Sequence, residues 1–241
     1  MRWLALGWAD LRAQPVPGLL HGLVIVAFGW MLLWLAREWF WLLAGAFSGF
    51  LIVAPIIATG LYHISRRRAQ GQEASTGEVL ALWRSGDGRL IRFGCLLALA
   101  GTGWVLPSAA LITLLSDVPI ERPADFLRHV VLVREVGLFE IWLLMGALLA
   151  APVFASSVMA IPMLVDTSVP VSMAVAESWR TVASQPLLMA LWAVVLALLS
   201  GIGMLTGLLG LIVVIPWLAH ASWHAYIELT ANSPYKMAGH L

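Results

Sequence analysis

Apolar residues in this chain gather in long runs, and short segments between the runs carry most of the charges. A helix needs about 20 mostly apolar residues to cross a bilayer. The last run, residues 186–227, holds 42 residues without a charge. At 1.5 Å per residue one helix of that length would extend roughly 63 Å, twice a hydrocarbon core. The run therefore predicts two helices joined by a hairpin, near Gly201, Gly203, Gly207 and Gly210.

The whole pattern predicts an all-α, polytopic membrane protein that forms a single integral-membrane domain over residues 1–241. We expect six transmembrane helices in three hairpins, with spans at about 18–36, 39–64, 90–115, 138–165, 186–204 and 207–227 and an outer loop at 116–137. Prolines predict kinks or breaks within several spans, at Pro55, Pro107, Pro152, Pro162 and Pro216. In the outer loop, residues 125–135 have the pattern of an amphipathic helix that either docks a partner or lies on the bundle.

Three segments that precede the predicted hairpins resemble one another. In each, a tryptophan stands seven residues before the start of an apolar run, as in Trp8 and Pro15, Trp83 and Leu90, and Trp179 and Pro186. Each segment predicts a short helix in the membrane interface on the cytoplasmic side. Ser75 with Glu78 predicts a capping box for the second helix, and Ser168 or Ser172 a cap for the third. The unit of interfacial helix, span and span is then used three times in parallel.

The basic residues predict the orientation of the six spans. Ten of them fall on the side of both termini: Arg2, Arg12, Arg66, Arg67, Arg68, Arg84, Arg89, Arg92, Arg180 and Lys236. Four fall on the other side: Arg37, Arg122, Arg128 and Arg134. Cytoplasmic loops carry the excess of Lys and Arg, so both termini are expected in the cytoplasm.

Composition agrees with a membrane protein and narrows its function. Hydrophobic residues make up 61% of the chain and charged residues 11%, against about 25% charged in soluble domains. The formal net charge of +1 argues against nucleic-acid binding, which requires a basic surface. The single cysteine, Cys95, excludes an intramolecular disulfide. The chain has no Gly-rich phosphate loop, HExxH, serine elbow or CxxC motif, so no catalytic residue is assigned and an enzyme is not expected.

Histidines are the strongest candidates for chemistry. His220 and His224 lie four residues apart, on one face of a helix, and His63 and His21 fall toward the same predicted membrane side. Neutral imidazoles in such a set can bind a transition metal or haem. The same residues can instead satisfy carbonyl groups and lipid headgroups at helix ends, or belong to a proton or substrate path. All three interpretations stay open.

Two further sets of residues have a predicted role. Arg66, Arg67 and Arg68 are a topology signal and candidates for binding anionic lipid headgroups. Three pairs of small residues, four apart, predict close helix packing: Gly18 and Gly22, Gly45 and Gly49, and Gly203 and Gly207.

Several motifs together resemble a known family: GWADLR from Gly7, GLYHISRRRAQGQ from Gly60, SSVMAIPMLVD from Ser156, SWR…QP from Ser178, and GLIVVIPWLAHASWHAY ending at Tyr226. The chain resembles, over nearly its whole length, a bacterial integral-membrane family catalogued as a domain of unknown function. The resemblance implies a six-span protein of the inner membrane. An acidic residue often stands at the position of His63 in that family, which leaves His220 and His224 as the better ligand pair.

Some members of that family carry the label of a cytochrome c oxidase subunit I, which needs more spans and buried histidines than this chain has. The leading hypothesis is a non-enzymatic accessory or assembly partner of another membrane complex. The alternatives are a small carrier or channel with three parallel repeats, and a haem- or metal-binding membrane protein that uses the HxxxH pair. The lipid bilayer is the one partner expected in every case, and neither the membrane-complex partner nor the oligomeric state follows from the sequence.

Overall fold

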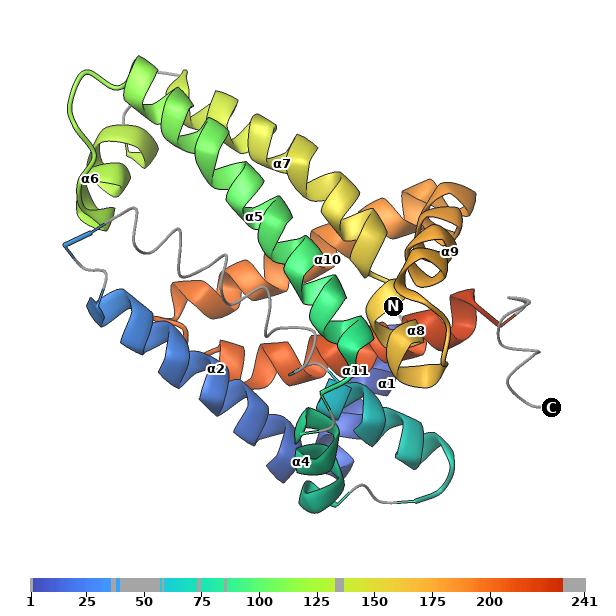
Figure 1. The fold of residues 1–241 in the computed structure, drawn as a ribbon. Coiled ribbons are helices and arrows are strands. Elements are labelled where there is room, and N and C mark those ends of the chain that lie inside the picture. Colours follow the sequence, from blue (N-terminus) through green and yellow to red (C-terminus); the bar gives the residue numbers. More distant parts are fainter. Residues whose placement is uncertain are drawn as a thin grey trace.

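The computed structural model describes residues 2–35, 38–39, 57, 59–72, 75–84, 86–132 and 137–231, and these residues form helices and connecting turns without a strand. The long helices run between two ends of the molecule (Figure 1). The helices α1, α8 and α9 gather at one end, and α6 lies at the other. The all-α prediction is confirmed.

The helices have the following bounds. They are α1 (Arg2–Ala13), α2 (Pro15–Leu35), an unlabelled helix at 59–69, α4 (Thr76–Arg84), α5 (Gly88–Leu115), α6 (Pro123–Phe126), α7 (Leu138–Ser157), α8 (Ala160–Asp166), α9 (Val171–Ser184), α10 (Pro186–Leu205) and α11 (Leu211–Leu229). A short π-helical turn, η1 (Leu127–Val131), continues α6.

Within the described ranges, four helical segments are long and apolar enough to cross a membrane: Pro15–Leu35, Gly88–Leu115, Leu138–Asp166 and Pro186–Leu205. They match the first, third, fourth and fifth predicted spans. The second, 39–64, lies largely outside the described residues. The last corresponds to α11, which starts later than predicted and contains the buried polar residue His220. The arrangement of six spans therefore stays a prediction.

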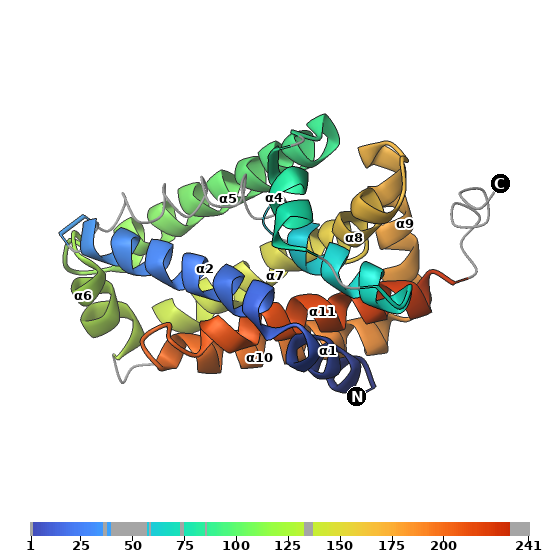
Figure 2. The same ribbon diagram turned by 90° about the horizontal axis from the view of Figure 1, so that it is seen from below.

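The helix α11 packs against α1, α2, α8 and α10. Figure 2 shows α1 lying across α11 near the start of α2. Two glycines permit these crossings, since a Cβ at Gly7 would lie 2.5 Å from the backbone nitrogen of Ala221, and one at Gly22 would overlap the carbonyl group of Ile212. Close backbone approach of this kind is typical of packed membrane helices.

Each of the three short helices stands where the repeat predicts one: α1 before α2, α4 before α5, and α9 before α10. The capping box of α4 is confirmed, because the Glu78 N–H donates to Ser75 Oγ (3.1 Å) and the Ser75 N–H to Glu78 Oε2 (3.3 Å). The predicted cap of α9 is wrong. Its N-cap is Pro170, without a side-chain cap, because a proline already fixes the backbone angle with which the chain enters the helix.

The fourth predicted span is broken into α7 and α8 at residues 158–159. Pro162 causes the break, since a proline lacks an N–H and its ring collides with the carbonyl four residues earlier, that of Val158. The N–H of Met159 is satisfied by Ser178 Oγ of α9 at 3.1 Å. The proline prediction is confirmed here, whereas Pro107, Pro152 and Pro216 lie inside continuous helices.

The predicted hairpin between residues 186 and 227 is present. Residues 206–210 form the turn between α10 and α11, with left-handed backbone at Gly207 (φ 66°) and Leu208 (φ 72°). A Cβ at Gly210 would lie 2.9 Å from Gly203 Cα, so these two glycines let the arms of the hairpin meet.

At the opposite end from α1, the predicted loop helix is shorter than expected. It runs through α6 and η1 to Val131, and residues 133–136 lie outside the described part. Val130 is buried with Ile112 and Ile120. Trp142 donates its indole N–H to Ser108 Oγ at 2.6 Å. The structure shows the loop helix lying on the bundle, and docking of a partner there stays a prediction.

Candidate functional site: a buried carboxylate cluster

A carboxylate from α1 is the centre of a buried polar cluster. Asp10 Oδ2 accepts from Ser65 Oγ (2.7 Å) and from His224 Nε2 (2.8 Å), and Asp10 Oδ1 lies 2.8 Å from Arg68 Nε. His220 Nδ1 lies 2.8 Å from Ser65 Oγ. Asp10, Ser65 and His220 are all buried. We call these five residues the Asp10 cluster.

Three helices bring the cluster together. Gly7 and Asp10 lie on the buried face of α1, and the close crossing at Gly7 places that face against Ala221, next to His220. Ser65 belongs to the helix at 59–69 and the two histidines to α11. Because residues four apart share a helix face, both imidazoles reach the same carboxylate environment.

The hydrogen bonds determine where the protons lie. An ionised carboxylate only accepts, so Ser65 donates its single proton to Asp10. Ser65 Oγ must then accept from His220, which places the His220 proton on Nδ1 and leaves a lone pair on Nε2. His220 Nε2 is buried and has no hydrogen-bond partner among the described residues. The Ser65 proton points at Asp10, so this hydroxyl is not arranged as a histidine-activated nucleophile.

Electrostatics favour the ionised form of Asp10. Burial raises the pKa of Asp10, but the hydrogen bonds from His224 and Ser65 outweigh burial, and the pKa falls below its ordinary value near 3.8. The Arg68 guanidinium, 2.8 Å away, acts in the same direction. The cluster therefore holds a carboxylate at neutral pH, balanced by a cation whose side chain is 42% exposed.

An arginine triplet, Arg66–Arg68, extends the cluster across the molecule. Arg66 pairs with Asp166 at the end of α8 (3.4 Å), Arg67 with Glu78 of α4 (3.1 Å), and Arg68 with Asp10 of α1. Consecutive residues of a helix point about 100° apart, so the three side chains reach three different helices. The arginines thus tie the 59–69 helix to α1 of the first predicted repeat and to α4 and α8 of the second.

Asp166 also accepts a hydrogen bond from the Tyr226 hydroxyl at 2.9 Å. Beside it, Arg89 donates to the carbonyl oxygens of Leu164, Thr167 and Val169 at 2.8–3.1 Å. Leu164 belongs to the last turn of α8, and Thr167 and Val169 follow its end. The carbonyl groups at the end of a helix have no partner within the helix. The arginine thus caps α8 from the start of α5.

Of the four predicted ligands, the structure brings His220 and His224 into one cluster. His63 lies apart, 3.4 Å from Glu78 Oε2. His21 Nδ1 lies 2.6 Å from the carbonyl of Pro17. Within the described ranges, no group of three or more His, Cys, Asp or Glu residues could hold a metal ion. A metal or haem site at these histidines stays a prediction.

The predicted packing glycines lie in different settings. A Cβ at Gly18 would meet Leu11 at 2.6 Å, and one at Gly203 would meet Leu211 at 2.7 Å. Gly207 has no atom within 4 Å of such a Cβ and serves the turn instead. Gly45 and Gly49 lie outside the described residues.

Sequence reasoning missed Asp10 and Ser65. A signal was present, because Asp10 lies in GWADLR, Ser65 in GLYHISRRRAQGQ and both histidines in GLIVVIPWLAHASWHAY. Three separate motifs that carry the family resemblance meet at one buried point.

One family model matches residues 42–166, slightly more than half of the chain, and its description is predicted integral membrane protein (DUF2189). No curated protein matches the chain, and no solved structure does.

Proposed function

Because the chain belongs to DUF2189, a family of integral membrane proteins, we propose that it is a non-enzymatic accessory or assembly partner of a larger membrane complex. We also propose that it lies in a bacterial inner membrane as six spans, with both termini in the cytoplasm. Contact with the lipid bilayer follows from its long apolar helices.

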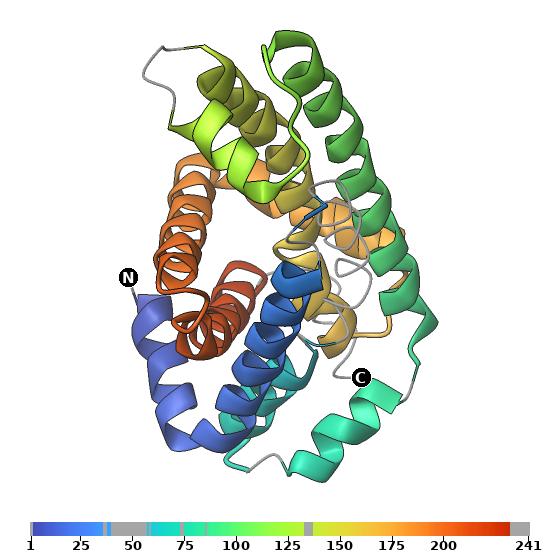
Figure 3. The ribbon, with the colours of Figure 1, turned by 90° about the vertical axis from the view of Figure 1, so that its left-hand side faces the viewer.

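The proposal of a partner rests on one surface groove. It has a volume of about 490 Å³ and lies along α5 and α7, with Ala100, Gly103, Trp104, Leu149 and Val153 among its lining residues. In the described part of the chain, α5 and α7 pack chiefly against each other and against α8 and α9. Figure 3 shows this pair on one side of the molecule and α1, α2 and α11 toward the other.

The floor of the groove suits a transmembrane helix of another protein. Helices associate in lipid where small residues let backbones approach, since lipid tails leave no hydrophobic driving force between them. Gly103 has no atom within 4 Å of the position of an added Cβ, so the α5 backbone is open there. In contrast, the charged side chains of the Asp10 cluster pair with one another.

A glycine substitution tests this function. Gly103→Leu places a side chain in the groove, and Gly201→Leu on α10 is the matched control, because the added Cβ meets open space at both positions. At native expression, we expect one membrane protein to co-purify in fixed ratio with the wild type and with Gly201→Leu, and to be lost with Gly103→Leu. All three chains should melt at similar temperatures.

A photo-crosslinking residue identifies the contact surface. Placed at Leu96, which lines the groove and is 53% exposed, it should form an adduct with the same partner. Placed at Leu114 of the same helix, which is 80% exposed and lies outside the groove, it should react with lipid. Recovery of the wild-type chain alone, or of the same partner with Gly103→Leu, would refute the proposal.

The buried lone pair on His220 Nε2 favours a second candidate, a site for a transition metal or haem. Purified protein should then show stoichiometric metal or a Soret band. Both signals should vanish with His220→Ala and persist with His63→Ala, because His63 lies outside the cluster. Absence of both signals from the wild type would exclude this candidate.

A further inference from the structure

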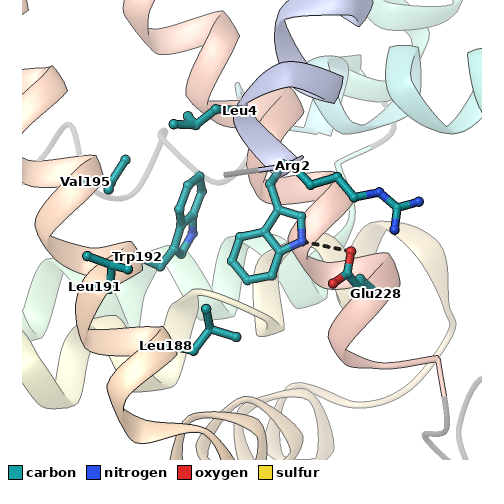
Figure 4. Close-up of a pocket in the computed structure, with 8 residues that line it drawn as sticks. Arg2, Leu4, Leu188, Leu191, Trp192, Val195 and Glu228 are labelled. Atoms are coloured by element: carbon teal, nitrogen blue, oxygen red, sulfur yellow. Dashed lines mark hydrogen bonds between the residues drawn. The ribbon is translucent and has the colours of Figure 1, made fainter.

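A second cavity lies at the same end of the molecule as the Asp10 cluster. It has a volume of about 220 Å³ and lies between the start of α1, the first half of α10 and the end of α11. Figure 4 shows Arg2 and Glu228 at one end of the cavity and Leu191 and Val195 at the other. The cavity is therefore amphipathic, with charge at one end and aliphatic side chains at the other.

An indole between these two ends, that of Trp192, has an N–H without a hydrogen-bond partner among the described residues. Trp192 is 3% exposed, and its Nε1 has no hydrogen-bond acceptor among the described residues. Its ring packs edge-on with Trp3 at a centroid distance of 5.4 Å. A buried donor without an acceptor is costly, so a ligand that supplies an acceptor oxygen at this wall would be stabilised.

The charged end has one cationic and one anionic group. Glu228 Oε2 accepts from Trp3 Nε1 at 3.1 Å, which leaves Oε1 to accept from a ligand. The Arg2 guanidinium makes no ion pair with a described residue. A guanidinium suits a phosphate, and a carboxylate suits an ammonium group. The pair is thus complementary to a zwitterionic headgroup.

We propose that this cavity binds a diacyl phospholipid with a phosphoethanolamine headgroup. Arg2 binds the phosphate, Glu228 binds the ammonium, and the Trp192 N–H donates to an ester carbonyl. The acyl chains leave the cavity along α10, where Leu187, Leu191, Val194 and Leu198 are exposed. The site differs from the predicted headgroup site at Arg66–Arg68, whose arginines already pair with acids.

Lipid chemistry tests the indole contact without changing the protein. Delipidated full-length protein in detergent is titrated with ester-linked phosphatidylethanolamine and with its ether-linked analogue, and bound lipid is measured by native mass spectrometry. The ether lipid lacks the carbonyl, so the wild type should bind it about fivefold more weakly, the size of one neutral hydrogen bond. Trp192→Phe should bind both lipids equally. Equal binding of both by the wild type would overturn the proposal.

Three charge variants test the headgroup contacts. Wild type should prefer phosphatidylethanolamine over phosphatidylglycerol, and Glu228→Gln should lose that preference, because only the first lipid carries an ammonium. Arg2→Gln should weaken the binding of both lipids. Arg12→Gln, on α1 outside the cavity lining, should bind both lipids as the wild type does. A wild type without headgroup preference, or a preference that survives Glu228→Gln, would overturn the assignment. A melting curve for each variant confirms that it is folded.

Discussion

Removal of the Asp10 carboxylate should destabilise the fold more than removal of any exposed acid. Asp10→Ala breaks contacts with Ser65, His224 and Arg68, all at 2.7–2.8 Å. It leaves the buried Ser65 hydroxyl without its acceptor and Arg68 without its counter-ion.

The structure sets the size of this effect. Removing one partner of a buried ion pair typically costs about 3–5 kcal/mol. The Arg68 side chain is 42% exposed and can be hydrated once its partner is removed. The lost ion pair therefore contributes about 1 kcal/mol or less to the loss of stability. The orphaned Ser65 hydroxyl costs about 1–3 kcal/mol, and the lost bond from His224 to a charged acceptor about 1.5–3 kcal/mol. Together these contributions predict a loss of about 3–7 kcal/mol in the free energy of unfolding.

Reversible unfolding in mixed detergent micelles measures this free energy. Glu78→Ala is the control, because Glu78 also pairs with an arginine of the triplet but its side chain is 40% exposed, and its effect should be clearly smaller. Equal losses from Asp10→Ala and Glu78→Ala would refute the reasoning that burial gives the Asp10 cluster its strength.

The pH dependence provides a second readout. The pKa of Asp10 is lowered in the fold, so its stabilisation is complete above its ordinary value near 3.8. That contribution is lost as the pH falls through the lower, folded pKa. Wild type should therefore lose stability on acidification below about pH 4, and Asp10→Asn should lack this part of the pH dependence.

Three more substitutions test the packing. Gly22→Ala should cost at least about 2 kcal/mol, because the new methyl overlaps the Ile212 carbonyl; a melting temperature close to wild type would contradict the helix crossing. Ser178→Ala should cost about 1–3 kcal/mol by leaving the Met159 N–H without an acceptor, measured by the same unfolding assay. Arg89→Ala should accelerate amide hydrogen exchange at the end of α8, whose carbonyls it caps, and leave exchange in α10 unchanged.

Local features of the fold followed from the sequence because local chemistry determines them. Pro162 lacks an N–H and marks a possible break, but Pro107, Pro152 and Pro216 lack it too and lie inside continuous helices. At the break before Pro162, Ser178 of α9 accepts the hydrogen bond from the Met159 N–H. The Ser75–Glu78 capping box depends on residues three apart. The turn at Gly207 was required by the length of the apolar run around it. For the capping box and the turn, no distant contact is needed to decide the outcome.

The Asp10 cluster could not be predicted in the same way. Its hydrogen bonds join residues separated by 55, 155 and 214 positions, so no local pattern contains it. Asp10 has the sequence context of an exposed acid near a helix end. Only the approach of α1 to α11, which Gly7 permits, turns it into the centre of a buried network.

The arginine triplet shows how one segment can serve both topology and packing. The positive-inside rule counts Lys and Arg, and acidic residues contribute little to it. Pairing with Asp10, Glu78 and Asp166 after folding therefore leaves the topology signal intact. Binding of anionic headgroups would instead compete with these ion pairs. The ion pair of Arg67 is the easiest to displace, because its partner Glu78 is the most exposed of the three acids at 40%. The ion pair of Arg68 is the hardest to displace, because its partner Asp10 is 7% exposed. A lipid at this segment would thus displace Glu78 before Asp10, and the buried cluster would stay closed.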